Sequence, residues 1–248
     1  MTPTSWTAWL RALSVAFVLI AAPSASPVRA VENGHKVGVV SFGLFGDQGV
    51  FRREATGAAQ VVASRFAIGP VDVQYNVRTG GAATVDGLAK SLQAEARRLD
   101  ADNDVLFVIL TSHGSPDGLA VKAGRLMQTL TPSELAGMLA RTGVRHKVVV
   151  ISACYSGVFV RRLASPDLLV ITAADARHSS FGCEDRARWT YFGDAFFNIA
   201  LRHTTSLKDA FALARGLVRK RELHEHFDPS NPQMAGGANV EPLLVARP

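Results

Sequence analysis

Two segments of this sequence each place one reactive side chain directly after a hydrophobic run. Residues 105–110 are followed by Thr-Ser-His-Gly, which contains His113, and residues 147–151 are followed by Ser-Ala-Cys-Tyr-Ser-Gly, which contains Cys154. A thiol that loses its proton to an imidazole becomes a thiolate, which is a strong nucleophile for acyl groups. The two segments together therefore predict a catalytic dyad of Cys154 and His113.

The same segments contain the other groups that such a reaction needs. After accepting the proton of Cys154, His113 can protonate a leaving amine. Gly114 allows the backbone to approach a substrate closely, and its N–H with that of Cys154 is predicted to stabilise a carbonyl oxyanion. A single cysteine or histidine is commonly a structural residue. It is the pairing of the two that favours catalysis.

The reactive residues lie within a regular alternation of predicted strands and helices. Continuous apolar runs are typical of strands that are buried on both faces of a parallel sheet. Strands are predicted at 36–42, 71–77, 105–110, 147–151 and 168–171. Helical spacing covers 55–66, 84–99, 131–139, 192–199 and 206–218, with capping by Thr84, by Thr131 with Glu134, and by Ser206. The pattern predicts one α/β domain with a mostly parallel sheet covered on both faces.

This architecture predicts where the functional residues meet. In open α/β sheets, sites gather beyond the carboxyl ends of the strands, and His113 and Cys154 each follow such an end. A hairpin is expected over residues 119–127, after the turn residues Pro-Asp-Gly. Residues 227–237 are rich in Pro, Asn and Gly and are expected to form a loop, and residues 241–246 are expected to form a final strand.

The first thirty residues have the pattern of an export signal. An apolar core at 12–22 follows Arg11, and Val28 and Ala30 are small residues at the −3 and −1 positions of a cut before Val31. We expect residues 1–30 to be a signal peptide and residues 31–248 a single domain. The protein is then exported, periplasmic or secreted, with no stable membrane span after cleavage. The alternative is an uncleaved N-terminal membrane anchor.

Composition limits the other function classes. The net charge is +6, two of the arginines lie in the predicted leader, and the two cysteines exclude a disulfide scaffold. The basic run at 219–221 closes a helix, so no nucleic-acid partner is expected. The run His224-Glu225-His226 lacks a third ligand, so no metal site and no cofactor are expected. The sequence does not fix the oligomeric state.

Several further segments, in order, resemble the caspase-like cysteine proteases and specifically the legumain (C13) family. These segments are 51–55 (Phe-Arg-Arg-Glu-Ala), 172–174 (Thr-Ala-Ala), 179–183 (Ser-Ser-Phe-Gly-Cys) and 190–194 (Thr-Tyr-Phe-Gly-Asp), beside the His-Gly and Ala-Cys segments. In legumain, residues 51–55 correspond to Tyr-Arg-His-Gln-Ala. The resemblance covers most of residues 36–205. It implies a caspase-like three-layer α/β/α sandwich and a bacterial-type exported member of the family.

The resemblance also implies roles for individual residues. His113 would be the general base and Cys154 the nucleophile. Arg52, Ser179 and Asp194 would line the pocket for the residue before the cut bond, which in the family holds Asn through its amide. An arginine donor beside an aspartate acceptor suits a side chain with both a carbonyl and an NH2 group.

Some positions depart from the family pattern. Ser152 is counted with the pocket, but legumain has Glu at this position, two residues before the nucleophile. Arg53 replaces a His, Val50 stands where legumain has an Asn, and Ser112 replaces an Asp before the catalytic His. Losing the Glu and the His is expected to make the pocket more basic, so that Asp or another side chain competes with Asn.

The sequence therefore predicts an exported cysteine endopeptidase of legumain type, which hydrolyses a protein or peptide substrate through a thioester on Cys154. One alternative within the same fold is a transamidase or peptide ligase, in which an amine replaces water. Another is a catalytically inactive caspase-like binding module, in which Cys154 would react with thiol reagents no faster than Cys183. A structural role for Cys183 is favoured over a disulfide with Cys154, because a disulfide would block the nucleophile.

Overall fold

A computed structural model describes residue 1, residues 35–66 and residues 69–244 of the chain. Contacts divide the chain into residues 1–33 and residues 34–248. The predicted signal peptide lies outside the described residues, apart from Met1. Within the described ranges, no helix combines the length and the apolar character that crossing a membrane requires.

The centre of the folded unit is a seven-stranded sheet with the order β10-β9-β8-β4-β1-β2-β3. The five inner strands are parallel, and the short strands β3 and β10 run antiparallel at the two edges. The bounds are β1 Val37–Gly43, β2 Val71–Val77, β3 Gly80–Gly81, β4 Val105–Thr111, β8 His146–Ser152, β9 Leu168–Thr172 and β10 Gln233–Ala235. The five predicted strands are confirmed.

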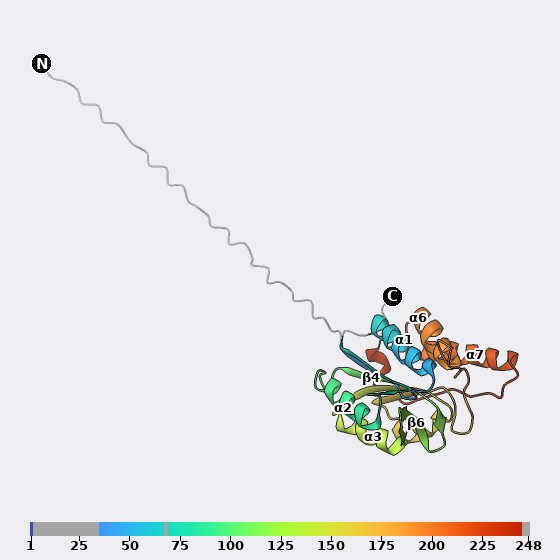
Figure 1. Cartoon of the computed structure of the whole chain (residues 1–248). Helices are drawn as coiled ribbons and strands as arrows, with labels where there is room; N and C mark the ends of the chain where they lie inside the picture. Colours follow the sequence, from blue (N-terminus) through green and yellow to red (C-terminus); the bar gives the residue numbers. More distant parts are fainter. Residues whose placement is uncertain (2–34, 67–68, 245–248) are drawn as a thin grey trace. The chain divides into compact units, whose positions relative to one another are not determined.

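Helices cover both faces of this sheet (Figure 1). One face carries α1 (Gly49–Arg65), α5 (Tyr191–Gly193), η2 (Asp194–Ala200), α6 (Leu201–His203) and α7 (Leu207–His224). The other face carries α2 (Val85–Ala96), α3 (Pro132–Arg141), η1 (Ser156–Phe159) and α4 (Val160–Leu163). The prediction of a mostly parallel sheet between two helical layers is confirmed.

Side chains along the inner strands point alternately to the two faces of the sheet and contribute to a hydrophobic core on each face. In β4, Phe107 and Ile109 contribute to the core beneath α1 and α7, whereas Val108 and Leu110 contribute to the core beneath α2 and α3. The strand is buried along its whole length, which is why its sequence is continuously apolar. The predicted caps are confirmed at Thr84, at Ser206 and at the Thr131–Glu134 capping box.

A small second sheet follows β4. It has the order β5-β6-β7, with β5 at Gly114–Ser115, β6 at Gly118–Ala123 and β7 at Leu126–Leu130. The predicted hairpin is confirmed. β5 begins at Gly114, so the residue after the predicted base is already fixed by strand pairing.

Two expectations for the C-terminal segment were wrong, and one helix is more irregular than predicted. The expected loop at 227–237 contains β10, whose three residues pair with β9 at the sheet edge and are too short to give a strand pattern. In the expected strand at 241–246, Glu241–Leu243 forms a 3-10 turn (η3) around Pro242, which has no N–H for strand pairing, and residues 245 and 246 lie outside the described residues. The helix predicted at 192–199 is present, but η2 within it is a wide π-type turn, a form frequent at functional sites.

Candidate active site

The sheet register brings the predicted dyad to one place. Thr111, the last residue of β4, pairs with Ser152, the last residue of the adjacent parallel strand β8. His113 and Cys154 each follow this pair by two residues. The two loops also touch, because a Cβ atom added to Gly114 would lie 1.9 Å from the carbonyl oxygen of Cys154. The loops that carry His113 and Cys154 therefore lie next to each other at the carboxyl edge of the sheet.

The imidazole of His113 is held between two aromatic rings and an amide. The ring centroids of Phe45 and Phe51 lie 4.7 Å and 5.0 Å from that of His113, both edge-on. Nε2 of His113 makes a close contact with Oε1 of Gln48, the residue that precedes α1. If Nε2 donates to this oxygen, the proton is on Nε2 and Nδ1 keeps its lone pair. Burial lowers the pKa of His113, so the neutral, basic form is favoured.

The sulfur of Cys154 rests against Ser180, on the loop between β9 and α5. The Ser180 N–H donates to Sγ over 3.3 Å, and the carbonyl oxygen of Ser180 also lies 3.3 Å from Sγ. The backbone of Ser180 therefore holds the sulfur in place from one side. In the described part of the chain no hydrogen bond joins Sγ to His113, and catalytic hydrogen bonds commonly form only once substrate is bound.

The backbone around Cys154 is strained and has a free donor. Tyr155, directly after the nucleophile, has a φ of 54° and is tied to the loop by its N–H, which donates to the His178 carbonyl over 2.9 Å. Left-handed conformations in non-glycine residues cluster at functional sites. Among the described residues, no acceptor binds the N–H of Cys154. That N–H is available to a substrate oxygen, and its oxyanion role stays a prediction.

The second cysteine has a different environment. Cys183 and Cys154 are both free thiols. Burial raises the pKa of Cys183 to about 12, with smaller contributions from the nearby Cys154 and Glu54. Cys183 therefore stays protonated near neutral pH and is a poor nucleophile.

A buried carboxyl lies beneath the ends of β4 and β8. Glu54 of α1 is fully buried and accepts hydrogen bonds from the Thr111 hydroxyl (2.9 Å) and the Thr190 N–H (2.7 Å). The hydroxyl of Ser152 lies near this carboxyl group. Burial raises the pKa of Glu54, and these hydrogen bonds oppose the rise. α1 thus places a buried carboxyl group near Ser152, and the expectation of a more basic substrate pocket stays a prediction.

The four residues predicted to line the substrate pocket are not all close together. Ser152 is buried, and its hydroxyl lies 2.9 Å from that of Thr190, whose carbonyl accepts the N–H of Asp194. Ser179 is half-buried and precedes Ser180 at the nucleophile. Arg52 is exposed, with its guanidinium 5.8 Å from the centre of the Tyr75 ring. The Asp194 carboxylate accepts from Asn198, and no ion pair joins it to Arg52 in the described ranges.

Three residues in contact with the predicted site escaped the sequence analysis. Gln48 and Ser180 act at His113 and Cys154 through contacts between distant segments, which no local pattern reveals. Glu54 directly precedes the helix predicted at 55–66, and extending that helix by one turn would have placed an acidic residue on its apolar face, where it needs partners. Among the described residues, no group of three or more histidine, cysteine or acidic side chains is placed to hold a metal ion.

Comparisons with known proteins identify a matching family and a similar fold. The family model described as the peptidase C13 family matches residues 52–238. Among solved structures, the chain is similar to caspase-1 from Spodoptera frugiperda, with 15% identity, a TM-score of 0.56 and coverage of 82% of this chain and 87% of that one. The latter likeness supports the caspase-like three-layer fold. No reviewed protein sequence matches the chain significantly.

Proposed function

We propose that this chain, which belongs to the peptidase C13 family, cleaves peptide bonds with Cys154 as nucleophile and His113 as general base. It is a cysteine peptidase of the caspase and legumain kind, and its substrate is a protein. The proposal for the individual residues rests on one observation. The loops that carry His113 and Cys154 leave a paired strand end and pack against each other at Gly114.

The reaction begins with transfer of the thiol proton from Cys154 to His113. The thiolate attacks the carbonyl carbon, and the oxyanion that forms is stabilised by the N–H groups of Cys154 and Gly114. The C–N bond then breaks, and the leaving amine takes the proton from His113. Water attacks the resulting thioester while His113 accepts its proton. The C–S bond breaks and the Cys154 thiol is restored.

The residue before the cut bond is proposed to be Asn, in line with the family resemblance. Ser179 lies beside the nucleophile, Ser152 and Asp194 meet at Thr190, and Glu54 contributes a carboxyl beneath Ser152. These groups offer acceptors for an amide NH2.

A panel of fluorogenic peptides that differ only at this residue, as Asn, Asp, Ala or Arg, tests the proposal. We expect cleavage after Asn, no activity in Cys154→Ala or His113→Ala, and retained activity in Cys183→Ala. Cleavage by the Cys154→Ala protein would overturn the assignment of the nucleophile. Mass spectrometry of the products with an added glycine peptide separates hydrolysis from transfer to an amine.

Export is proposed from the N-terminal sequence pattern, with cleavage after Ala30. Expression of the full chain in a bacterial host, followed by fractionation and N-terminal sequencing, tests it. The expected first residue is Val31 in the periplasmic or secreted fraction. Recovery of the intact chain in the membrane fraction would instead indicate that the N-terminal segment is an uncleaved membrane anchor.

A further inference from the structure

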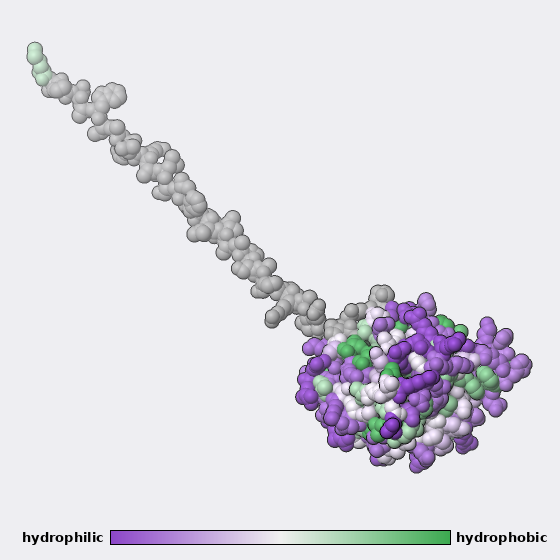
Figure 2. Space-filling view, in the orientation of Figure 1, coloured by the Kyte–Doolittle hydropathy of each residue, from purple (hydrophilic) through white to green (hydrophobic). Residues whose placement is uncertain are grey.

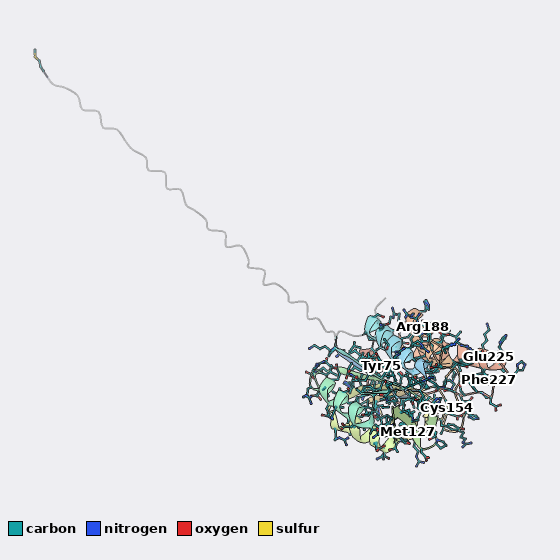
Figure 3. The ribbon with its side chains drawn as sticks, in the orientation of Figure 1. Tyr75, Met127, Cys154, Arg188, Glu225 and Phe227 are labelled. Atoms are coloured by element: carbon teal, nitrogen blue, oxygen red, sulfur yellow. The ribbon has the colours of Figure 1, made fainter. Side chains whose placement is uncertain are left out.

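A cavity of about 580 Å³ opens between α1 and the loop that leads from Ser180 to α5. Four arginines line it: Arg52 and Arg53 from α1, and Arg186 and Arg188 from the loop. No acidic side chain is part of its lining. Tyr75 of β2 forms another wall, and Figure 3 shows Tyr75 and Arg188 together with Cys154. We call the space lined by the four arginines the arginine cavity.

The positive charge of the arginine cavity is only partly compensated by the protein itself. Arg53 donates to the backbone carbonyl of Ala187, which fixes its position, and both Arg53 and Arg186 lie close enough to Asp185 to lower the pKa of that carboxyl. The nearest acid, Asp185, accepts the N–H of Gly49 over 2.7 Å and lies 3.7 Å from Arg78. In the described ranges no ion pair includes Arg52, Arg186 or Arg188, and all three side chains are exposed.

The arginine cavity is built from the same two segments as the catalytic cleft. Arg52 follows Phe51, whose ring packs 5.0 Å from that of His113. Arg186 lies six residues beyond Ser180, which contacts the nucleophile. An extended peptide advances about 3.3 Å per residue. A peptide bound at Cys154 is expected to extend along α1 and this loop towards the cavity.

We propose that the arginine cavity binds a cluster of acidic side chains on the protein substrate, so that the enzyme selects bonds close to an acidic segment. This inference rests on the proposed peptidase function. Guanidinium groups pair with carboxylates in a fork geometry, and four of them around one cavity suit several carboxylates better than one small oxyanion. The visible face of the folded unit combines hydrophilic regions with smaller apolar ones (Figure 2).

Arg186 and Arg188 are the positions to test, because the predicted substrate pocket does not include them. The full chain carrying Cys154→Ala is mixed with labelled peptides that share one core sequence. Each peptide has Glu-Asp-Glu or Gln-Asn-Gln placed either before or after that core, and binding is measured by fluorescence anisotropy. We expect at least one acidic peptide to bind more tightly than its neutral match and to lose affinity as NaCl rises.

The variant R186Q/R188Q is expected to weaken binding of that acidic peptide about fivefold and to leave the neutral peptide unchanged. The matched control is R97Q/R141Q, which removes two exposed arginines at the ends of α2 and α3, on the other face of the sheet. We expect this control to retain the full preference for acidic peptides. Thermal unfolding of both variants verifies that they fold.

Equal binding of acidic and neutral peptides, or a preference that R186Q/R188Q leaves intact, would overturn the proposal. Displacement of the acidic peptide by an equal concentration of inorganic phosphate would also overturn it, because the site would then accept isolated oxyanions. Binding in the Cys154→Ala protein does not depend on catalysis. If the unmodified enzyme cleaves peptides but shows no preference for acidic ones, only the proposed role of the cavity is refuted. If acidic peptides bind but the unmodified enzyme cleaves none of them, only the peptidase proposal is refuted.

Discussion

The backbone of Gly114 packs directly against the carbonyl of Cys154. A Cβ atom at position 114 would lie 1.9 Å from that oxygen, far inside the contact distance of any pair of non-bonded atoms. The residue after the predicted base and the predicted nucleophile itself are thus fixed relative to each other by backbone contact. The paired ends of β4 and β8 support this contact from below.

The first prediction concerns this contact. Gly114→Ala forces the two loops apart, and a displacement near 1 Å at a catalytic site costs about 100-fold in rate. We expect kcat/KM for the best fluorogenic peptide to fall by at least about that factor. Gly216→Ala in α7 is the matched control, because nothing lies within 4 Å of its added Cβ. Full activity in Gly114→Ala would show that the loops need not touch.

The second prediction concerns the pH profile. Burial lowers the pKa of His113, so its neutral form persists below pH 6.5 and the acidic limb of kcat/KM should lie below that value. Gln48→Glu places a carboxylate at Nε2, which favours the imidazolium and should move the limb upward by about one unit. Gln48→Ala should lower kcat without this upward movement. If the limb stays fixed in Gln48→Glu, Gln48 does not act on His113.

The third prediction uses the raised pKa of Glu54. A carboxyl group whose pKa is raised in the folded state contributes its full stabilisation of the fold at pH values below its ordinary pKa of 4.5. This contribution is lost as the pH rises through the pKa of the folded state. Glu54→Gln has no such loss. Its Tm relative to the unmodified protein should therefore rise as pH increases above 4.5.

Glu134→Gln is the contrasting control for Glu54. Hydrogen bonds from Thr131 lower the pKa of Glu134, so its contribution is present above pH 4.5 and lost on acidification. The Glu134→Gln variant should therefore lose Tm relative to the unmodified protein as pH rises. A Glu54→Gln protein that follows the same trend as Glu134→Gln would mean that Glu54 is charged and well solvated.

The fold was predictable because its signals are local. Unbroken apolar runs mark β4 and β8, and Thr131 with Glu134 marks the start of α3. By contrast, β10 has three residues and is held only by its pairing with β9. Pro242 turned an apparent final strand into a 3-10 turn.

The site was predictable only in part, for a related reason. His113 and Cys154 each follow the end of a strand, and the ends of neighbouring parallel strands lie at the same edge of the sheet. Glu54 is paired with Thr190, 136 residues later, and so no sequence window contains both. Arg52 carries the residue type of the family's pocket, yet its guanidinium faces Tyr75 and the arginine cavity. The direction of a side chain depends on packing that residue type does not encode.

The most direct test of the central claim is to compare how fast the two cysteines react. The full chain is treated with a thiol-reactive alkylating agent at neutral pH, and mass spectrometry follows Cys154 and Cys183 separately. The pKa of Cys183 is raised to about 12, so we predict that Cys154 reacts at least about tenfold faster. His113→Ala should slow Cys154 and leave Cys183 unchanged. Equal rates for the two cysteines, or a Cys154 rate that does not depend on His113, would contradict the assignment of these residues as a catalytic dyad.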